Sequence, residues 1–124
     1  MRTEQIGDAR VEVLTPAEAR DRFDRNEIVL IDVRTPAEYM FDHIHGALLF
    51  PMSSFKPEKL PAQDQKPIVF HCGSGMRSQK IMEICAAAGI SPLAHMEGGF
   101  GAWKSQGLAY IAIDPATGAM TDRP

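Results

Sequence analysis

The segment Ile68–Ser78 (IVFHCGSGMRS) organises the rest of the chain. Its first three residues are apolar and predict a short buried strand, and Arg77–Ala88 predicts a helix. Between them, Cys72 opens a loop with two glycines, which allow backbone conformations and close approaches that other residues forbid. The N–H groups of such a loop and the start of the following helix both attract negative charge. A cysteine placed there favours its nucleophilic thiolate form over the inert thiol of a packed core.

The composition indicates one compact domain. The chain has 124 residues, of which 44% are hydrophobic, and a net charge of −3 without a basic run, so we expect no nucleic-acid partner. No apolar run approaches the ~18 residues of a membrane span, and the N-terminus lacks the apolar core of a secretory signal. Cys72 and Cys85 do not make a disulfide framework, so we expect a cytoplasmic protein that does not bind membranes.

Capping boxes mark two helix starts. Thr15-Pro16-Ala17-Glu18 predicts a helix to about Arg25, and Thr35-Pro36-Ala37-Glu38 predicts one to about Phe41. Between them, Ile28–Val33 is almost continuously apolar, which is typical of a strand buried in a parallel sheet.

The remaining elements follow from shorter patterns. We expect strands at 11–14, 47–50, 67–71 and 93–96, a turn at 42–46, a helical turn at 57–60 and a short helix after 98–99. Residues 1–10 are expected to be a loose arm, 108–113 an extra strand and 114–124 a tail. The main helix should bury Ile81, Ile84, Cys85 and Ala88. Alternating strands and helices predict an α/β fold, whose parallel strands would bring Asp32, Arg34 and Cys72 to one edge.

The chain resembles the rhodanese (sulfurtransferase) domain family. The matching motifs are Ile31-Asp32-Val33-Arg34, Glu38-Tyr39, His43-Ile44 with Gly46-Ala47, Cys72 with Gly75 and Arg77-Ser78, and Gly98-Gly99 with Trp103. The resemblance implies a three-layer domain over residues 11–107, with a five-stranded, mainly parallel sheet flanked by helices. Residues 1–10 and 108–124 would lie outside it as an N-terminal arm and a C-terminal extension. Asp42 departs from the family, which usually has Gly there.

The resemblance also implies an enzyme of the thiosulfate sulfurtransferase type, and we expect it to use no cofactor and no metal. The Cys72 thiolate would take the outer sulfur of a small donor such as thiosulfate and pass it to a thiophilic acceptor. The persulfide would be held by the loop residues Gly73, Ser74, Gly75, Met76, Arg77 and Ser78. Because Arg77 is the loop's one cation, we expect low affinity for thiosulfate.

The other candidate residues have structural interpretations. Arg77 either neutralises an anionic donor or pairs with Glu83 or Asp32. Asp32 and Arg34 are expected to support the loop, and His71 to make a structural hydrogen bond. The side chains of Cys85, Phe100 and Trp103 are expected in the core. His43 and His45 have no metal-ligand spacing to Cys72 or His71.

Two other functions compete with sulfur transfer to small acceptors. The first is a persulfide carrier or regulatory module for a protein partner, to which the exposed Met76 and the C-terminal extension would be suited. The second is a cysteine phosphatase or arsenate reductase, whose loop places five residues between Cys and Arg, whereas four separate Cys72 from Arg77. The shorter loop favours a sulfur atom over a tetrahedral oxyanion. The sequence is compatible with a monomer or a homodimer.

Overall fold

We describe the fold from a computed structural model, which covers residues 1–123. The strands are β1 (Arg2–Ile6), β2 (Ala9–Leu14), β3 (Val29–Asp32), β4 (Asp42–His43), β5 (Leu48–Leu49), β6 (Ile68–His71), β7 (Leu93–Met96), β8 (Tyr110–Ile113) and β9 (Met120–Arg123). The helices are α1 (Pro16–Asp24), α2 (Pro36–Phe41), α3 (Met76–Ala87) and α4 (Gly99–Ser105), with 3₁₀ turns η1 (Met52–Ser54) and η2 (Pro57–Lys59).

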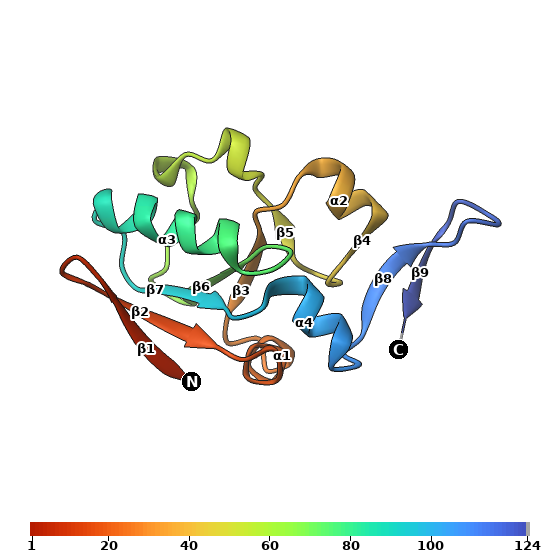
Figure 1. Ribbon diagram of the computed structural model, residues 1–124, viewed down its shortest axis with the longest axis horizontal. Helices are drawn as coiled ribbons and strands as arrows, with labels where there is room; N and C mark the ends of the chain where they lie inside the picture. The colour runs from red at the N-terminus through yellow and green to blue at the C-terminus, as the bar shows by residue number, and fades with distance from the viewer. Residues whose placement is uncertain (124) are drawn as a thin grey trace.

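Six strands form the central sheet in the order β1-β2-β7-β6-β3-β5 (Figure 1). The strands β2, β7, β6, β3 and β5 run parallel, whereas β1 pairs antiparallel with β2. The expected mainly parallel sheet with flanking helices is therefore confirmed, with β1 as an added edge strand.

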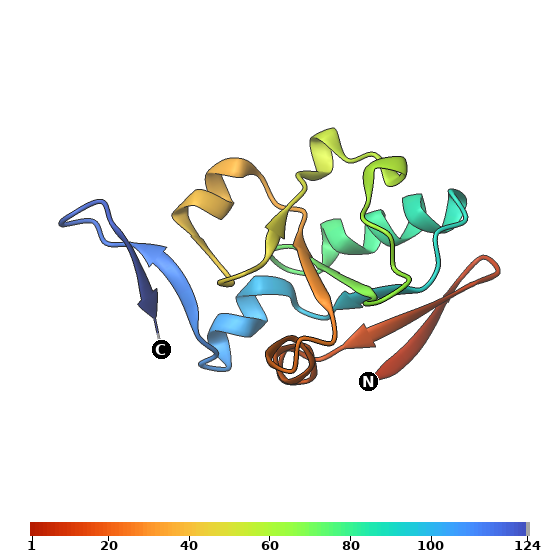
Figure 2. The ribbon, with the colours of Figure 1, turned by 180° about the vertical axis from the view of Figure 1, so that it is seen from behind.

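Side chains alternate between the two faces of the sheet and build two cores, as the period of a strand requires. Leu30 and Val69 pack with α1 and α4 on one face, where Phe100 and Trp103 are buried. Ile31 and Phe70 pack with α3 on the other face. Figures 1 and 2 show α3 and α1 on opposite sides of the sheet, which makes the three layers.

The N-terminal residues are not the loose arm that the sequence suggested. Arg2–Ile6 pairs with residues 9–13 of β2 through a tight hairpin at Gly7 and Asp8. Gly7 has φ +58°, a left-handed conformation that glycine adopts without strain. The arm is thus an integral edge of the sheet.

The C-terminal extension is also folded. Tyr110–Ile113 confirms the expected extra strand, and it pairs with both β4 and β9 to form a second sheet of three strands. The expected tail is wrong for residues 120–123, which form β9, and its last residue, Pro124, lies outside the described residues. The hairpin of β8 and β9 extends from the end of the molecule opposite β1 (Figure 1). The Trp103 indole N–H donates to the Ala109 carbonyl at 2.9 Å, which joins this hairpin to α4.

Helix starts were predicted better than helix faces. Both capping boxes are formed, with Thr15 and Thr35 as N-caps of α1 and α2. In α3, Ile81 and Cys85 are buried as expected, but Ile84 is 39% exposed. The buried stripe runs through Ser78, Ile81, Met82 and Cys85, so the helix is rotated relative to the apolar pattern, and Ala88 is exposed. Ser78 therefore faces the sheet.

Within residues 1–123, no helix is long and apolar enough to cross a membrane.

Candidate functional site

Cys72 lies at the bottom of the loop between β6 and α3 and is fully buried. Its Sγ accepts hydrogen bonds from the backbone N–H of Gly75 at 3.0 Å and of Ser78 at 3.3 Å. The sequence predicted that the N–H donors would come from Gly73 to Arg77. Gly75 lies in this range, whereas Ser78 is one residue beyond it. Two N–H donors of this kind would stabilise negative charge on the sulfur.

Gly99 fixes the floor of the loop. A Cβ at Gly99 would lie 2.5 Å from the Cys72 carbonyl oxygen and 2.7 Å from the Gly73 carbonyl carbon, so a larger residue cannot fit without displacing backbone. The Phe100 N–H donates to the Cys72 carbonyl at 2.7 Å, and the Gly101 N–H donates to that of Gly73 at 2.9 Å. The start of α4 therefore holds the loop from below.

Ser78 connects Cys72 to a histidine that sequence reasoning missed. The Oγ of Ser78 lies 3.8 Å from Cys72 Sγ, 3.2 Å from the Gly75 carbonyl oxygen and 3.0 Å from Nδ1 of His95. His95 is 5% exposed and lies on β7 opposite Phe70 of β6. Burial lowers the pKa of His95, so its neutral form is favoured. The available signal was the alternation of side chains along the strand 93–96, which places His95 on the opposite face of the sheet from Ala94 and Met96.

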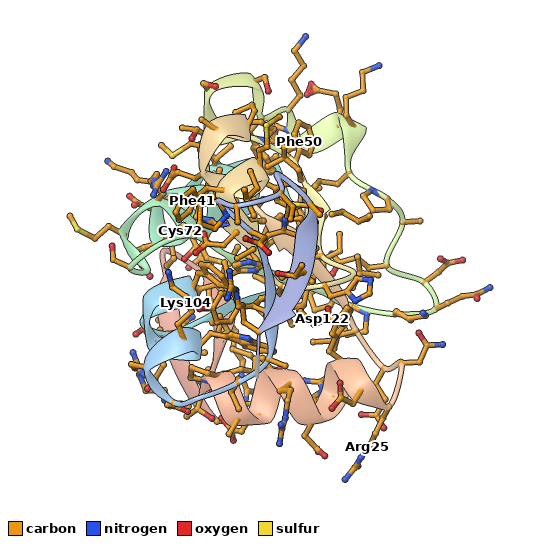
Figure 3. All side chains as sticks on the ribbon, turned by 90° about the vertical axis from the view of Figure 1, so that its right-hand side faces the viewer. Arg25, Phe41, Phe50, Cys72, Lys104 and Asp122 are labelled. Atoms are coloured by element: carbon orange, nitrogen blue, oxygen red, sulfur yellow. The ribbon has the colours of Figure 1, made fainter. Side chains whose placement is uncertain are left out.

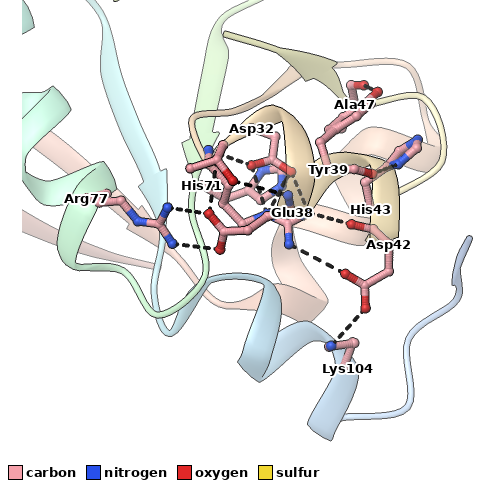
Figure 4. Close-up of polar contacts among 11 residues, drawn as sticks. Asp32, Glu38, Tyr39, Asp42, His43, Ala47, His71, Arg77 and Lys104 are labelled. Atoms are coloured by element: carbon pink, nitrogen blue, oxygen red, sulfur yellow. Dashed lines mark hydrogen bonds and ion pairs between the residues drawn. The ribbon is translucent and has the colours of Figure 1, made fainter. Parts of the chain in front are cut away.

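Arg77 does not reach either of its expected acidic partners, Glu83 or Asp32. Its Nη1 and Nη2 donate to the two carboxylate oxygens of Glu38, at 2.6 and 3.0 Å (Figure 4). Glu38 also closes the capping box of α2, where Oε1 accepts from the Thr35 N–H at 3.0 Å. The Arg77 guanidinium holds the pKa of Glu38 at about 2. The loop's one cation is therefore already paired.

Asp32 and Arg34 form a buried ion pair below the loop. Arg34 Nε and Nη2 donate to Asp32 Oδ2 at 3.0 and 2.9 Å, and the guanidinium carbon lies 4.5 Å from the Phe100 ring centre. Burial pushes the pKa of Asp32 upward, but the contacts with His71 and Arg34 outweigh it and hold that pKa well below its usual range. Both residues are buried, and Arg34 also lines a cavity described below.

His71 does not make the structural hydrogen bond expected of it. Its Nε2 lies 3.5 Å from Asp32 Oδ2, and neither ring nitrogen has a hydrogen-bond partner among residues 1–123. At 3.5 Å the Asp32 carboxylate lies beyond the normal hydrogen-bond distance from the ring.

Asp42 belongs to a strand and not to the turn predicted at this point. Its backbone is extended and pairs with Ala112 of β8. Its carbonyl oxygen accepts from Arg34 Nη2 at 2.6 Å, and its carboxylate lies 3.0 Å from Lys104 Nζ (Figure 4). Asp42 thus links Arg34 to α4 and to the C-terminal hairpin. A glycine at this position would have no carboxylate with which to contact Lys104.

The mouth of the loop combines a cavity with exposed apolar residues. A cavity of about 270 Å³ lies beside Arg77. It is lined by Val33, Arg34, Thr35, Pro51, Met52, Ser53 and Arg77. Ser74 and Met76 of the loop are exposed, Met76 by 78%. Phe41 of α2 is 66% exposed, and Figure 3 labels it together with Cys72.

The other cysteine and histidines have separate surroundings. Cys85 is buried in the core under α3, and burial raises the pKa of its thiol to about 11. His43 stacks on Tyr39 with ring centres 3.7 Å apart. Among residues 1–123, no three His, Cys, Asp or Glu side chains gather in a way that would hold a metal ion.

Comparison with known protein families gives a match that covers most of the chain. The model of the rhodanese-like domain matches residues 15–106. A probable adenylyltransferase/sulfurtransferase, MoeZ of Mycobacterium tuberculosis, is 38% identical over 103 residues, covering 79% of this chain and 26% of MoeZ. The thiosulfate sulfurtransferase GlpE of Coxiella burnetii is 30% identical over 88 residues, covering 71% of this chain and 82% of GlpE.

The chain spans only part of some curated relatives: 55% of an uncharacterised Synechocystis protein to which it is 34% identical, and about a quarter of MoeZ. Among solved structures, a Rhodopseudomonas palustris protein named a possible tyrosine phosphatase is 31% identical with a TM-score of 0.66, covering 78% of this chain and 82% of that one. A rhodanese-related protein of Thermoplasma volcanium, 24% identical with a TM-score of 0.70, covers 80% of this chain and 96% of its own, and it shares the fold.

Proposed function

Because this chain belongs to the rhodanese-like domain family, we propose that it is a sulfurtransferase that carries sulfane sulfur as a persulfide on Cys72. The observation that supports this most directly is the pair of backbone N–H donors on Cys72 Sγ at the end of a parallel strand. A persulfide needs such donors because its negative charge would otherwise be buried without partners.

The proposed reaction has two steps. The Cys72 thiolate attacks the outer sulfur of a donor, a new S–S bond forms, and the donor's sulfur bond breaks. With thiosulfate, sulfite departs with the electron pair of that bond. A thiophilic acceptor such as cyanide or a thiolate then attacks the outer sulfur, and Cys72 returns as a thiolate.

The charge around the loop favours donors that carry little negative charge. Arg77, the one cation among the loop residues 73–78, donates to Glu38 through both Nη groups. A dianion such as thiosulfate must compete with that carboxylate, so we propose that thiosulfate is a low-affinity donor. The adjacent cavity of about 270 Å³ suits a small donor molecule.

A persulfide carrier for a protein partner is a second candidate, and exposed apolar residues favour it. Met40 and Phe41 on α2 are 65% and 66% exposed, and Met76 at the start of α3 is 78% exposed. Glu38 and Arg77 join these two elements at the mouth of the loop. Exposed apolar side chains on these two elements suit contact with a protein donor or acceptor. Since both Cys72 and Cys85 are free thiols, we also propose a reducing, cytoplasmic location.

Phosphatase activity is the weaker alternative, although a structural relative carries that name. Four residues separate Cys72 from Arg77, and Arg77 is turned toward Glu38. Neither feature suits a tetrahedral oxyanion that needs a wide ring of donors and a free guanidinium.

Intact-mass measurement tests the proposal. The wild type and Cys72→Ser are exposed to thiosulfate, or to a cysteine desulfurase carrying a persulfide, and are then treated with cyanide. We expect the wild type to gain one sulfur atom that cyanide removes, and the variant to gain none. Faster loading from the desulfurase than from thiosulfate would favour the carrier function. Hydrolysis of a phosphate monoester by a protein that accepts sulfur from neither donor would contradict the proposal.

A further inference from the structure

The hydrogen bonds around Ser78 form a chain that leads from Cys72 into the sheet. Cys72 Sγ, Ser78 Oγ and His95 Nδ1 follow one another at 3.8 and 3.0 Å, and all three side chains are buried. Ser78 has one hydroxyl proton and three neighbours: Cys72 Sγ, the Gly75 carbonyl oxygen and His95 Nδ1. The direction of that proton decides whether the hydroxyl stabilises a negative sulfur.

His95 controls this direction through its ring nitrogen. If Nδ1 lacks a proton, it accepts the Ser78 hydroxyl proton and turns it away from Cys72. If Nδ1 carries a proton, it donates to Ser78 Oγ and leaves the hydroxyl proton for Cys72 Sγ or the Gly75 carbonyl. A negative charge on Cys72 favours the second arrangement, because a donor then points at it.

We propose that His95 is a positioning residue: through its Nδ1–H and the Ser78 hydroxyl, it supplies Cys72 Sγ with a third hydrogen-bond donor. The two backbone N–H groups of the loop are fixed in place, whereas the hydroxyl is orientable. The inference rests on the proposed use of the Cys72 thiolate, but its test does not require sulfur transfer.

Two further observations fit this role. His95 Nε2 is buried and has no hydrogen-bond partner among residues 1–123, so Ser78 is the ring's one polar contact within that part of the chain. Ser78 is one of the buried residues of α3, and its N–H already donates to Cys72 Sγ. Its hydroxyl therefore lies on the same side of the sulfur as a donor that the fold holds in place.

Charged groups nearby must be separated from the effect of the hydrogen bond. Those acting on His95 are Arg2 and Glu4 of β1 and Glu97 after β7. Arg77 of α3 interacts electrostatically with Cys72 and with Asp32 of β3. The variants described below keep all of these charged residues. They replace a neutral histidine by neutral residues, so the net charge does not change.

The test is a titration of the Cys72 thiolate by its ultraviolet absorbance, with the same variant carrying Cys72→Ser as the blank that removes the Cys85 signal. His95→Asn places an amide N–H near the position of Nδ1, whereas His95→Gln moves the same group one methylene further out. We expect Asn to match the wild type. We expect Gln and His95→Phe to lower the thiolate-to-thiol ratio at a given pH by roughly fivefold, the effect of one hydrogen bond of ordinary strength.

A double-mutant cycle identifies the route. Ser78→Ala should show the same loss, and Ser78→Ala with His95→Phe should be no worse than Ser78→Ala alone, because both changes remove one donor. Equal titrations of Asn and Gln variants, or additive losses in the cycle, would overturn the role of His95. Persulfide loading is measured separately: a normal titration without sulfur uptake would refute the proposed function and leave this inference standing.

Discussion

Replacing Glu38 by Gln should release Arg77 for substrate. The variant removes the carboxylate to which both Nη groups donate, at 2.6 and 3.0 Å. Gln keeps an Oε1 that accepts from the Thr35 N–H, and capping boxes use Gln as well as Glu. The start of α2 should therefore stay intact while the charge of Arg77 becomes available to an anionic donor.

The size of the effect follows from the pKa of Glu38, which falls from 4.5 to about 2, mainly because Arg77 donates to it. At ~1.36 kcal/mol for each unit of pKa change, the fall in the pKa of Glu38 corresponds to an interaction free energy of about 3 kcal/mol. Both side chains are 37% exposed, however, and solvent screening reduces the value of such a pair to ~1 kcal/mol. The contribution to stability is present above the ordinary pKa of a carboxyl and is lost as pH falls from 4.5 through about 2.

The assay is the steady-state transfer of sulfur from thiosulfate to cyanide at low ionic strength. We expect the KM for thiosulfate to fall by about fivefold in Glu38→Gln. This is the change in affinity that corresponds to the ~1 kcal/mol of the screened ion pair, because ~1.4 kcal/mol corresponds to tenfold. The difference should shrink as salt is added, because salt screens the charges.

Glu83→Gln is the matched control. Glu83 is exposed on the same helix as Arg77, and no ion pair joins the two within residues 1–123. This variant makes the same change in net charge and should leave the KM unchanged. An unaltered or higher KM in a folded Glu38→Gln protein would refute the idea that Glu38 and the donor compete for Arg77. Equal effects of the two variants would refute it as well.

Three further variants test the loop and its support. Gly99→Ala should lower stability by ~3 kcal/mol, and the melting temperature by about 10 °C, because its Cβ would lie 2.5 Å from the Cys72 carbonyl oxygen. Asp32→Asn should cost ~3 kcal/mol in denaturant unfolding, since it leaves the Arg34 cation buried without its carboxylate; a loss within error would contradict the buried-pair assignment. Cys85→Ala should take up sulfur at neutral pH as the wild type does, because the Cys85 pKa of about 11 keeps that thiol protonated; halved uptake would assign it a role.

Local signals in the sequence predicted the elements that carry the site. Thr15 and Thr35 start the helices they were expected to start, because a capping box is contained within four residues. The hairpin at Gly7 and Asp8 had a signal of the same kind, a two-residue turn between strand-like segments, that was not recognised.

Contacts between distant segments were not predictable in this way. Glu38 was assigned to a helix cap, and its pairing with Arg77, 39 residues later, depends on how α2 and α3 are placed over the sheet. His95 lies in an otherwise apolar strand, and its link to Ser78 appears only when β7 and α3 are packed together. Asp42 was predicted in a turn where the family usually has Gly, because its partners, Arg34 and Lys104, lie on other elements.

The burial of Cys72 affects which molecules can reach the sulfur before and after the proposed persulfide forms. The thiol is fully buried, and Gly99 and Phe100 hold the loop beneath it, so the resting sulfur is sheltered from oxidants and from bulky thiols. In the proposed persulfide, the second sulfur extends about 2 Å beyond the first. The atom to be delivered would then lie nearer the mouth, beside Arg77 and Met76, where an acceptor can meet it. Because the outer sulfur of the loaded protein would lie less deep than the resting thiol, bulkier molecules could react with the loaded form than with the resting form, without movement of the loop.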